Sequence, residues 1–93
     1  VNSRWTKGAR KQYNDVWMRL ETPEAMRELE EITLAGLAQI EIFPESAPQY
    51  RAFKDRPDIR MLTLKNYRLI YQIDGEELRV IAFQWGGSSS ALD

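Results

Sequence analysis

The stretch NYRLIYQIDGEELRVIAFQW, from Asn66 to Trp85, predicts two β-strands joined by a tight turn. A two-residue loop, at either Asp74-Gly75 or Gly75-Glu76, would join them as a hairpin. Both registers place the same six side chains on one face, which we expect to form the core against the helices. These residues are Leu69, Tyr71, Ile73, Leu78, Val80 and Ala82.

The opposite face of this hairpin mixes arginines with apolar and aromatic side chains. Such a mixture is the composition expected of an interaction surface. We therefore predict that a partner binds here, across the outer face and the free edge of the sheet. The competing interpretation is that residues 44–57 or the C-terminal tail cover this face. The predicted partner-binding residues are Arg68, Ile70, Arg79, Ile81, Phe83 and Trp85.

Two amphipathic helices are predicted upstream of the hairpin. Apolar residues from Ala9 to Leu20 recur at helical spacing, and Thr6 is a suitable N-cap. The run Thr22-Pro23-Glu24 marks the start of a second helix, which should end near residues 39–42. Gly36 lies on its apolar stripe, where we expect it to permit close approach to the first helix. The short connection between the two predicted helices, around residues 20–22, predicts that they form an antiparallel pair.

Residues 1–5 and Ile59–Leu64 predict two further strands, separated from each other by the helices and a polar, proline-bounded loop at 44–57. The predicted fold is α+β, with an N-terminal strand and an α-helical hairpin packed on a small antiparallel β-sheet. We expect a single domain over residues 1–93, in which 86–93 form a flexible tail. A chain of this size buries enough surface for one modest core.

The sequence contains neither cysteine nor histidine. Disulfides, thiol nucleophiles and cysteine-type zinc sites are therefore excluded, and the commonest general base and metal ligand is missing. The apolar stretches are too short to cross a membrane, and no signal peptide is visible. We expect a cytoplasmic protein that binds no metal and no cofactor.

Charge is distributed in blocks, although the net charge is only −1. Residues 1–20 carry five bases and one acid, whereas residues 21–45 carry seven acids and one base. Solvated helix faces are the favoured interpretation of both blocks. The acidic middle argues against a chain that wraps nucleic acid, which favours a continuous basic stripe.

Taken in order, these segments resemble the RelE/ParE toxin superfamily over about residues 3–85. SRWTKGARKQYNDVW resembles its opening strand and helix, and GLAQIEIFPESAP resembles the end of its second helix. IRMLTLKNYRLIYQIDGEELRVIAF resembles its sheet. The helix hairpin looks closer to the ParE branch. The resemblance implies a toxin of a bacterial type II toxin–antitoxin pair, neutralised by a cognate antitoxin.

The resemblance also implies one of two activities. RelE-like members cut messenger RNA in the ribosomal A site with basic residues on and after the sheet, whereas ParE-like members are associated with poisoning DNA gyrase. Arg60, Lys65 and Arg68 are the candidates here for stabilising charge on a phosphate. After the last strand, where further bases would be expected, the sequence reads Gly-Gly-Ser-Ser-Ser.

We therefore expect a toxin that acts by binding, with DNA gyrase as the implied target. Two alternatives remain open at this point. One is a ribosome-dependent mRNA endonuclease, whose partners are the ribosome and mRNA. The other is an inactive relative kept as an antitoxin-binding module. The sequence leaves the oligomeric state open.

Overall fold

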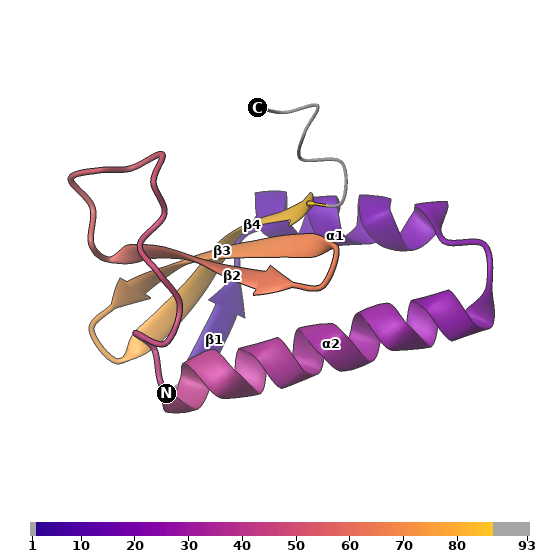
Figure 1. Ribbon diagram of the computed structural model, residues 1–93, viewed down its shortest axis with the longest axis horizontal. Coiled ribbons are helices and arrows are strands. Elements are labelled where there is room, and N and C mark those ends of the chain that lie inside the picture. Colours follow the sequence, from indigo (N-terminus) through magenta and orange to yellow (C-terminus); the bar gives the residue numbers. More distant parts are fainter. Residues whose placement is uncertain (1, 87–93) are drawn as a thin grey trace.

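The computed structural model describes residues 2–86 of the chain. Its elements follow the order β1 (Asn2–Trp5), α1 (Lys7–Arg19), α2 (Pro23–Ile42), β2 (Ile59–Leu64), β3 (Tyr67–Asp74) and β4 (Glu77–Trp85). The two helices are connected at one end, lie alongside the twisted sheet and extend beyond the end of the strands (Figure 1). No helix within residues 2–86 is long and apolar enough to cross a membrane. The tail predicted at 86–93 lies outside the described residues apart from Gly86.

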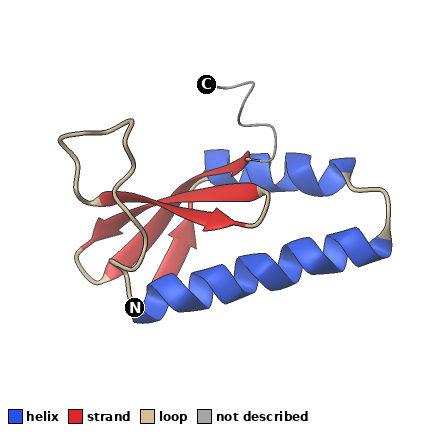
Figure 2. Cartoon of the chain, viewed as in Figure 1, coloured by secondary structure: helices blue, strands red, loops and turns tan. Residues whose placement is uncertain are grey.

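The four strands form one mixed sheet in the order β1-β4-β3-β2 (Figure 2). The α+β class is confirmed, and the predicted antiparallel meander is β2-β3-β4. The N-terminal strand adds to it in parallel, with Ser3 opposite Leu78 and Trp5 opposite Val80. Parallel pairing requires a long connection between the strands, which the helices and the rest of the sheet provide. As a result β4 is an inner strand, and the edges of the sheet are β1 and β2.

The β3–β4 hairpin turns at Gly75-Glu76, one of the two predicted loops. Gly75 has a φ of 64°, which glycine adopts without a steric penalty. Tyr71 pairs with Val80, but Ile70 pairs with Ala82, so Ile81 is an extra residue in β4. This β-bulge offsets the alternation of side chains for the rest of the strand.

The bulge changes which side chains of β4 face the helices. Leu69, Tyr71, Leu78 and Val80 are fully buried in the core, as predicted. The prediction was wrong for Ala82, because Phe83 stands opposite Leu69 on that face in its place. The placement of Phe83 and Trp85 on the outer face was wrong for the same reason. Phe83 is 1% exposed and belongs to the core.

Gly36 lies where α2 crosses β2. A Cβ atom on Gly36 would stand 2.5 Å from Leu64 Cδ2 and 3.0 Å from Leu62 Cδ2. The predicted close approach therefore exists, but it is to the sheet rather than to the first helix. The stripe of α2 that contains Gly36, with buried residues from Leu29 to Ile40, packs on the sheet.

Replacing Gly36 with valine should lower the free energy of unfolding by about 1–3 kcal/mol, because the new methyl groups overlap two core leucines. Gly8→Ala on α1 is the matched control, since a Cβ there meets nothing within 4 Å. That change should be neutral or stabilise by up to about 1 kcal/mol. Urea unfolding of both variants tests this, and a Gly36→Val protein as stable as wild type would contradict the close packing.

The segment between α2 and β2 pairs with the outer edge of β2. Gln49 forms an antiparallel bridge with Arg60, the Tyr50 N–H donates to the Ile59 carbonyl at 2.9 Å, and the Met61 N–H donates to the Pro48 carbonyl at 3.0 Å. Within residues 2–86 no backbone hydrogen bond extends this pairing past Met61. Half of the β2 edge is therefore covered, and the half next to the β2–β3 turn remains open to a further strand.

Candidate partner-binding site

The candidate catalytic residues Arg60 and Lys65 each have a partner within the fold. The Arg60 guanidinium donates to the carbonyl oxygens of Ala47 at 2.7 Å and Glu45 at 3.2 Å, which fastens the loop after α2 to β2. Lys65, in the two-residue turn after β2, pairs with Glu28 of α2 at 2.6 Å. Each contact holds two separate parts of the fold together, so both side chains have a structural role.

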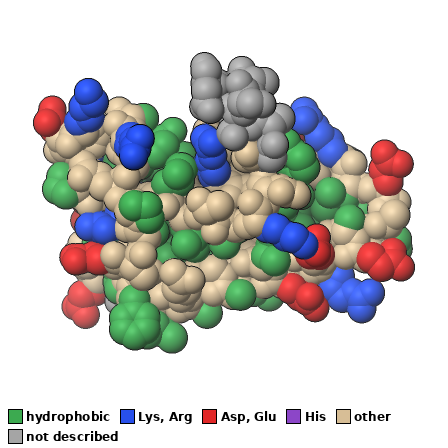
Figure 3. All heavy atoms as spheres, viewed as in Figure 1, with side chains coloured by type: hydrophobic (Ala, Val, Ile, Leu, Met, Phe, Trp, Pro, Cys, Tyr) green, Lys and Arg blue, Asp and Glu red, His purple; other side chains and the backbone are tan. Residues whose placement is uncertain are grey.

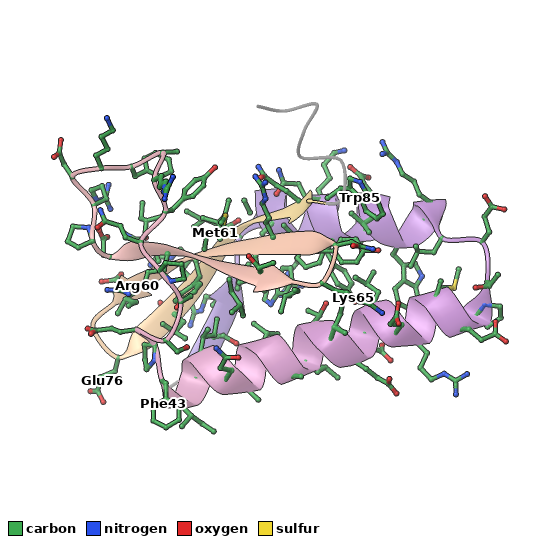
Figure 4. All side chains as sticks on the ribbon, in the orientation of Figure 1. Phe43, Arg60, Met61, Lys65, Glu76 and Trp85 are labelled. Carbon is green, nitrogen blue, oxygen red and sulfur yellow. The ribbon has the colours of Figure 1, made fainter. Side chains whose placement is uncertain are left out.

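The three candidates do not come together. Arg60 and Lys65 lie at opposite ends of β2 (Figure 4), which at strand spacing separates them by about 16 Å. Arg68 stands opposite Thr63 on the outer face of the sheet, whereas Arg60 shares the helix face with Leu62. Within residues 2–86 there is also no group of acidic side chains that could hold a metal ion.

Arg79, predicted to bind a partner, takes part in a polar network across the outer face. It donates to Gln72 at 2.9 Å and pairs with Asp74 at 3.1 Å. Gln72 in turn donates to Asp58 at 2.9 Å, and Asp58 pairs with Arg56 at 2.9 Å. The network links the segment before β2 to β3 and β4, and several donors of Arg79 are already used inside the chain.

The pKa of Asp58 is lowered by its place in this network. Hydrogen bonds from Arg56 and then from Gln72 hold the pKa of its carboxyl well below the ordinary value. A depressed folded-state pKa means that the unfolded chain binds the proton more readily. The stability that Asp58 contributes is therefore present above its unfolded pKa of about 3.9 and is lost as the pH falls below that value.

Asp58→Asn should accordingly reduce stability at neutral pH, and its difference from wild type should shrink as the pH falls from about 5 to about 2. Urea unfolding at a series of pH values measures this difference. Asp55→Asn, at an exposed position of the same loop, is the control. A difference that stays constant over this range would assign the effect of Asp58 to something other than its charge.

The six predicted partner-binding residues differ in the surface they offer. Ile70 is 2% exposed and Phe83 is 1% exposed, so neither presents its side chain to a partner in this conformation. Arg68 and Ile81 are half-buried on or beside the outer face. Trp85 is 44% exposed at the end of β4.

Trp85 lies beside the C-terminal end of α1. With Val16, Arg19 and Leu20 it lines a pocket of about 380 Å³. Its ring meets Tyr67 edge-on, with the centroids 5.2 Å apart.

Arg68 lies at the same end of the sheet, because it stands opposite Gln84 and its Cγ atom would be 3.1 Å from a Cβ on Gly86. We call this group the sheet-end site. It comprises Val16, Arg19, Leu20, Arg68 and Trp85.

Sequence reasoning missed the helical half of the sheet-end site. Val16 and Leu20 were recognised as members of an apolar stripe, but the stripe alone does not reveal that its last turn runs past the sheet. The apolar pocket includes a tryptophan and one arginine, Arg19, and a second arginine, Arg68, lies at the same end of the sheet on its outer face. This combination suits a segment with apolar and acidic side chains.

Comparisons with known proteins agree with this architecture. A sequence model of the ParE toxin of type II toxin–antitoxin systems (parDE) matches residues 3–84. A structure of the chromosomal ParDE system from P. aeruginosa superposes with a TM-score of 0.69 at 14% identity, covering 91% of this chain and 95% of that one. The solution structure of a conserved hypothetical protein from Helicobacter pylori gives 0.50 at 14% identity, covering 91% and 93%. The search of curated proteins gave no significant match.

Proposed function

The chain belongs to the ParE toxin family of type II toxin–antitoxin systems, and we propose that it acts by binding a protein target, DNA gyrase, rather than by cutting RNA. The observation that supports binding is the separation of Arg60, Lys65 and Arg68. Cleavage of RNA requires a base, an acid and positive charge gathered around one phosphate. Here two of the three cations are engaged in contacts inside the fold, at opposite ends of one strand.

Two assays with the purified chain test this proposal. We expect inhibition of DNA supercoiling by gyrase and no cleavage of mRNA bound to programmed ribosomes. In cells, induction of the chain alone should arrest growth, and co-expression of the cognate antitoxin should relieve the arrest. Lys65→Ala is the control, because it removes only an exposed ion pair with Glu28 and should leave the inhibition unchanged.

Other results would redirect the assignment. Ribosome-dependent cleavage that is lost in Arg60→Ala or Arg68→Ala would replace the binding mechanism with an endonuclease. Absence of any growth effect, with the antitoxin still bound, would identify an inactive relative. If growth stops but gyrase activity is unchanged, the chain is still a toxin, and DNA gyrase is excluded as its target.

We further propose that the cognate antitoxin binds at the sheet-end site and along the open half of the β2 edge. The open edge accepts an added strand through main-chain hydrogen bonds. Arg19 and Arg68 suit acidic side chains of that strand or of the residues flanking it, and Trp85 supplies an apolar anchor. Within residues 2–86 no ion pair engages either arginine, so both charges are available to a partner.

A further inference from the structure

The C-terminal half of α2 exposes large apolar side chains on the side away from the sheet. Leu34, Ala38 and Ile42 follow at four-residue spacing and therefore share one face of the helix. Leu34 is 61% exposed, Ile42 is 69% exposed, and Phe43, the C-cap of α2, is 65% exposed. Apolar side chains protrude at the lower left of the space-filling view, where Phe43 is labelled in the stick view (Figures 3 and 4).

A pocket of about 610 Å³ adjoins this face, between the end of α2 and the β3–β4 turn. Its apolar lining comes from Ile42, Phe43, Pro44 and Ile73. Apolar side chains scattered singly over a surface need no explanation, but a contiguous set beside a pocket marks an interaction site. We call this the α2-end surface. It comprises Leu34, Ala38, Ile42, Phe43 and Ile73.

Two carboxylates lie at the pocket end of the α2-end surface. Glu45 lines the pocket, and Glu76 follows the pocket residue Gly75 in the β3–β4 turn. The carboxylate of Glu41 instead accepts a hydrogen bond from the Ser3 hydroxyl of β1. Neither Glu45 nor Glu76 forms an ion pair within residues 2–86. Arg60, a cation of the same region, is committed to loop carbonyl oxygens. The rim is therefore acidic, the reverse of the sheet-end site.

We propose that the α2-end surface docks a segment of a second protein in which large apolar side chains stand beside lysine or arginine. The charge of the rim selects this occupant, because an acidic segment would meet repulsion here. A second copy of the chain is disfavoured for the same reason. Two copies joined through this surface would bring their acidic rims, which include Glu45 and Glu76, towards each other. The protein thus carries two docking surfaces of opposite charge preference.

Selection of random short peptides on the purified, full-length chain tests the proposal. We expect the enriched peptides to combine a large apolar residue with lysine or arginine. Fluorescence anisotropy with the tightest-binding such peptide should show that Phe43→Ser lowers the affinity for the peptide by about 30-fold or more. The double variant Glu45→Gln, Glu76→Gln should bind several-fold more weakly, with a reduced dependence on salt.

Met18→Ser is the matched control, because Met18 on α1 is 81% exposed and distant in sequence from the proposed surface. It should bind the peptide as wild type does, and circular dichroism checks that every variant is folded. Failure to enrich any peptide, or peptides that bind Phe43→Ser as well as wild type, would overturn the proposal. A concentration-dependent dimer in sedimentation that Phe43→Ser abolishes would also overturn the proposal, because the surface would then bind a second copy of the chain. None of these readouts depends on toxicity or on gyrase.

Discussion

Replacement of Phe83 by alanine is expected to lower the free energy of unfolding by about 3–5 kcal/mol. The ring is 1% exposed, and its centroid lies 5.1 Å from that of Tyr13, 5.6 Å from Tyr67 and 6.1 Å from Trp5. These neighbours come from α1, β3 and β1, so truncation leaves a cavity where four elements meet. Small domains are stable by about 5–15 kcal/mol, so this loss is a large fraction of the total stability.

Urea unfolding followed by circular dichroism measures this loss. Phe83→Leu is the matched variant, since it keeps most of the apolar volume and should cost clearly less than the alanine change. A loss below about 1 kcal/mol for Phe83→Ala would mean that the site collapses without a cavity. That result would also remove support for the bulge at Ile81, which turns Phe83 towards the helices.

Trp85→Ala, two residues further along the same strand face, should leave the fold intact and weaken binding of the cognate antitoxin. We expect a loss of about 2 kcal/mol or more, roughly 30-fold in Kd, because large aromatic anchors dominate binding energies. Trp85 is 44% exposed, and its pocket is formed with Val16 and Leu20. Phe83→Ala should therefore affect stability, whereas Trp85→Ala, only two residues away, should affect binding.

Calorimetry with the antitoxin compares wild type with Trp85→Ala, Arg68→Ala and Arg79→Ala. Loss of Arg68 at the rim should mainly slow association, which stopped-flow measurements would show. Arg79 already bonds to Gln72 and Asp74, so its removal should affect affinity less than removal of Trp85. Unchanged affinity in all three variants, with the fold intact, would move the antitoxin to another surface, such as the exposed side of the helix hairpin.

The sequence by itself determined the elements, because the signals that define them are local. Thr6 and Thr22 cap the two helices as predicted, and each hydroxyl accepts a hydrogen bond from the backbone three residues later, at 3.1 Å. The strand at Ile59–Leu64 and the turn at Gly75-Glu76 also followed from alternation and from a glycine in the turn. Such features depend on a few neighbouring residues, so a single sequence contains them.

Only the tertiary structure decided how these elements meet. One extra residue at Ile81 moves Phe83 into the core and brings Trp85 to the helix side, because side chains in a strand alternate with a period of two. Parallel pairing of β1 with β4 and the meeting of Trp85 with Val16 and Leu20 join residues far apart in the chain. Packing across such separations depends on the volumes and positions of several elements together, and no local pattern in the sequence records it.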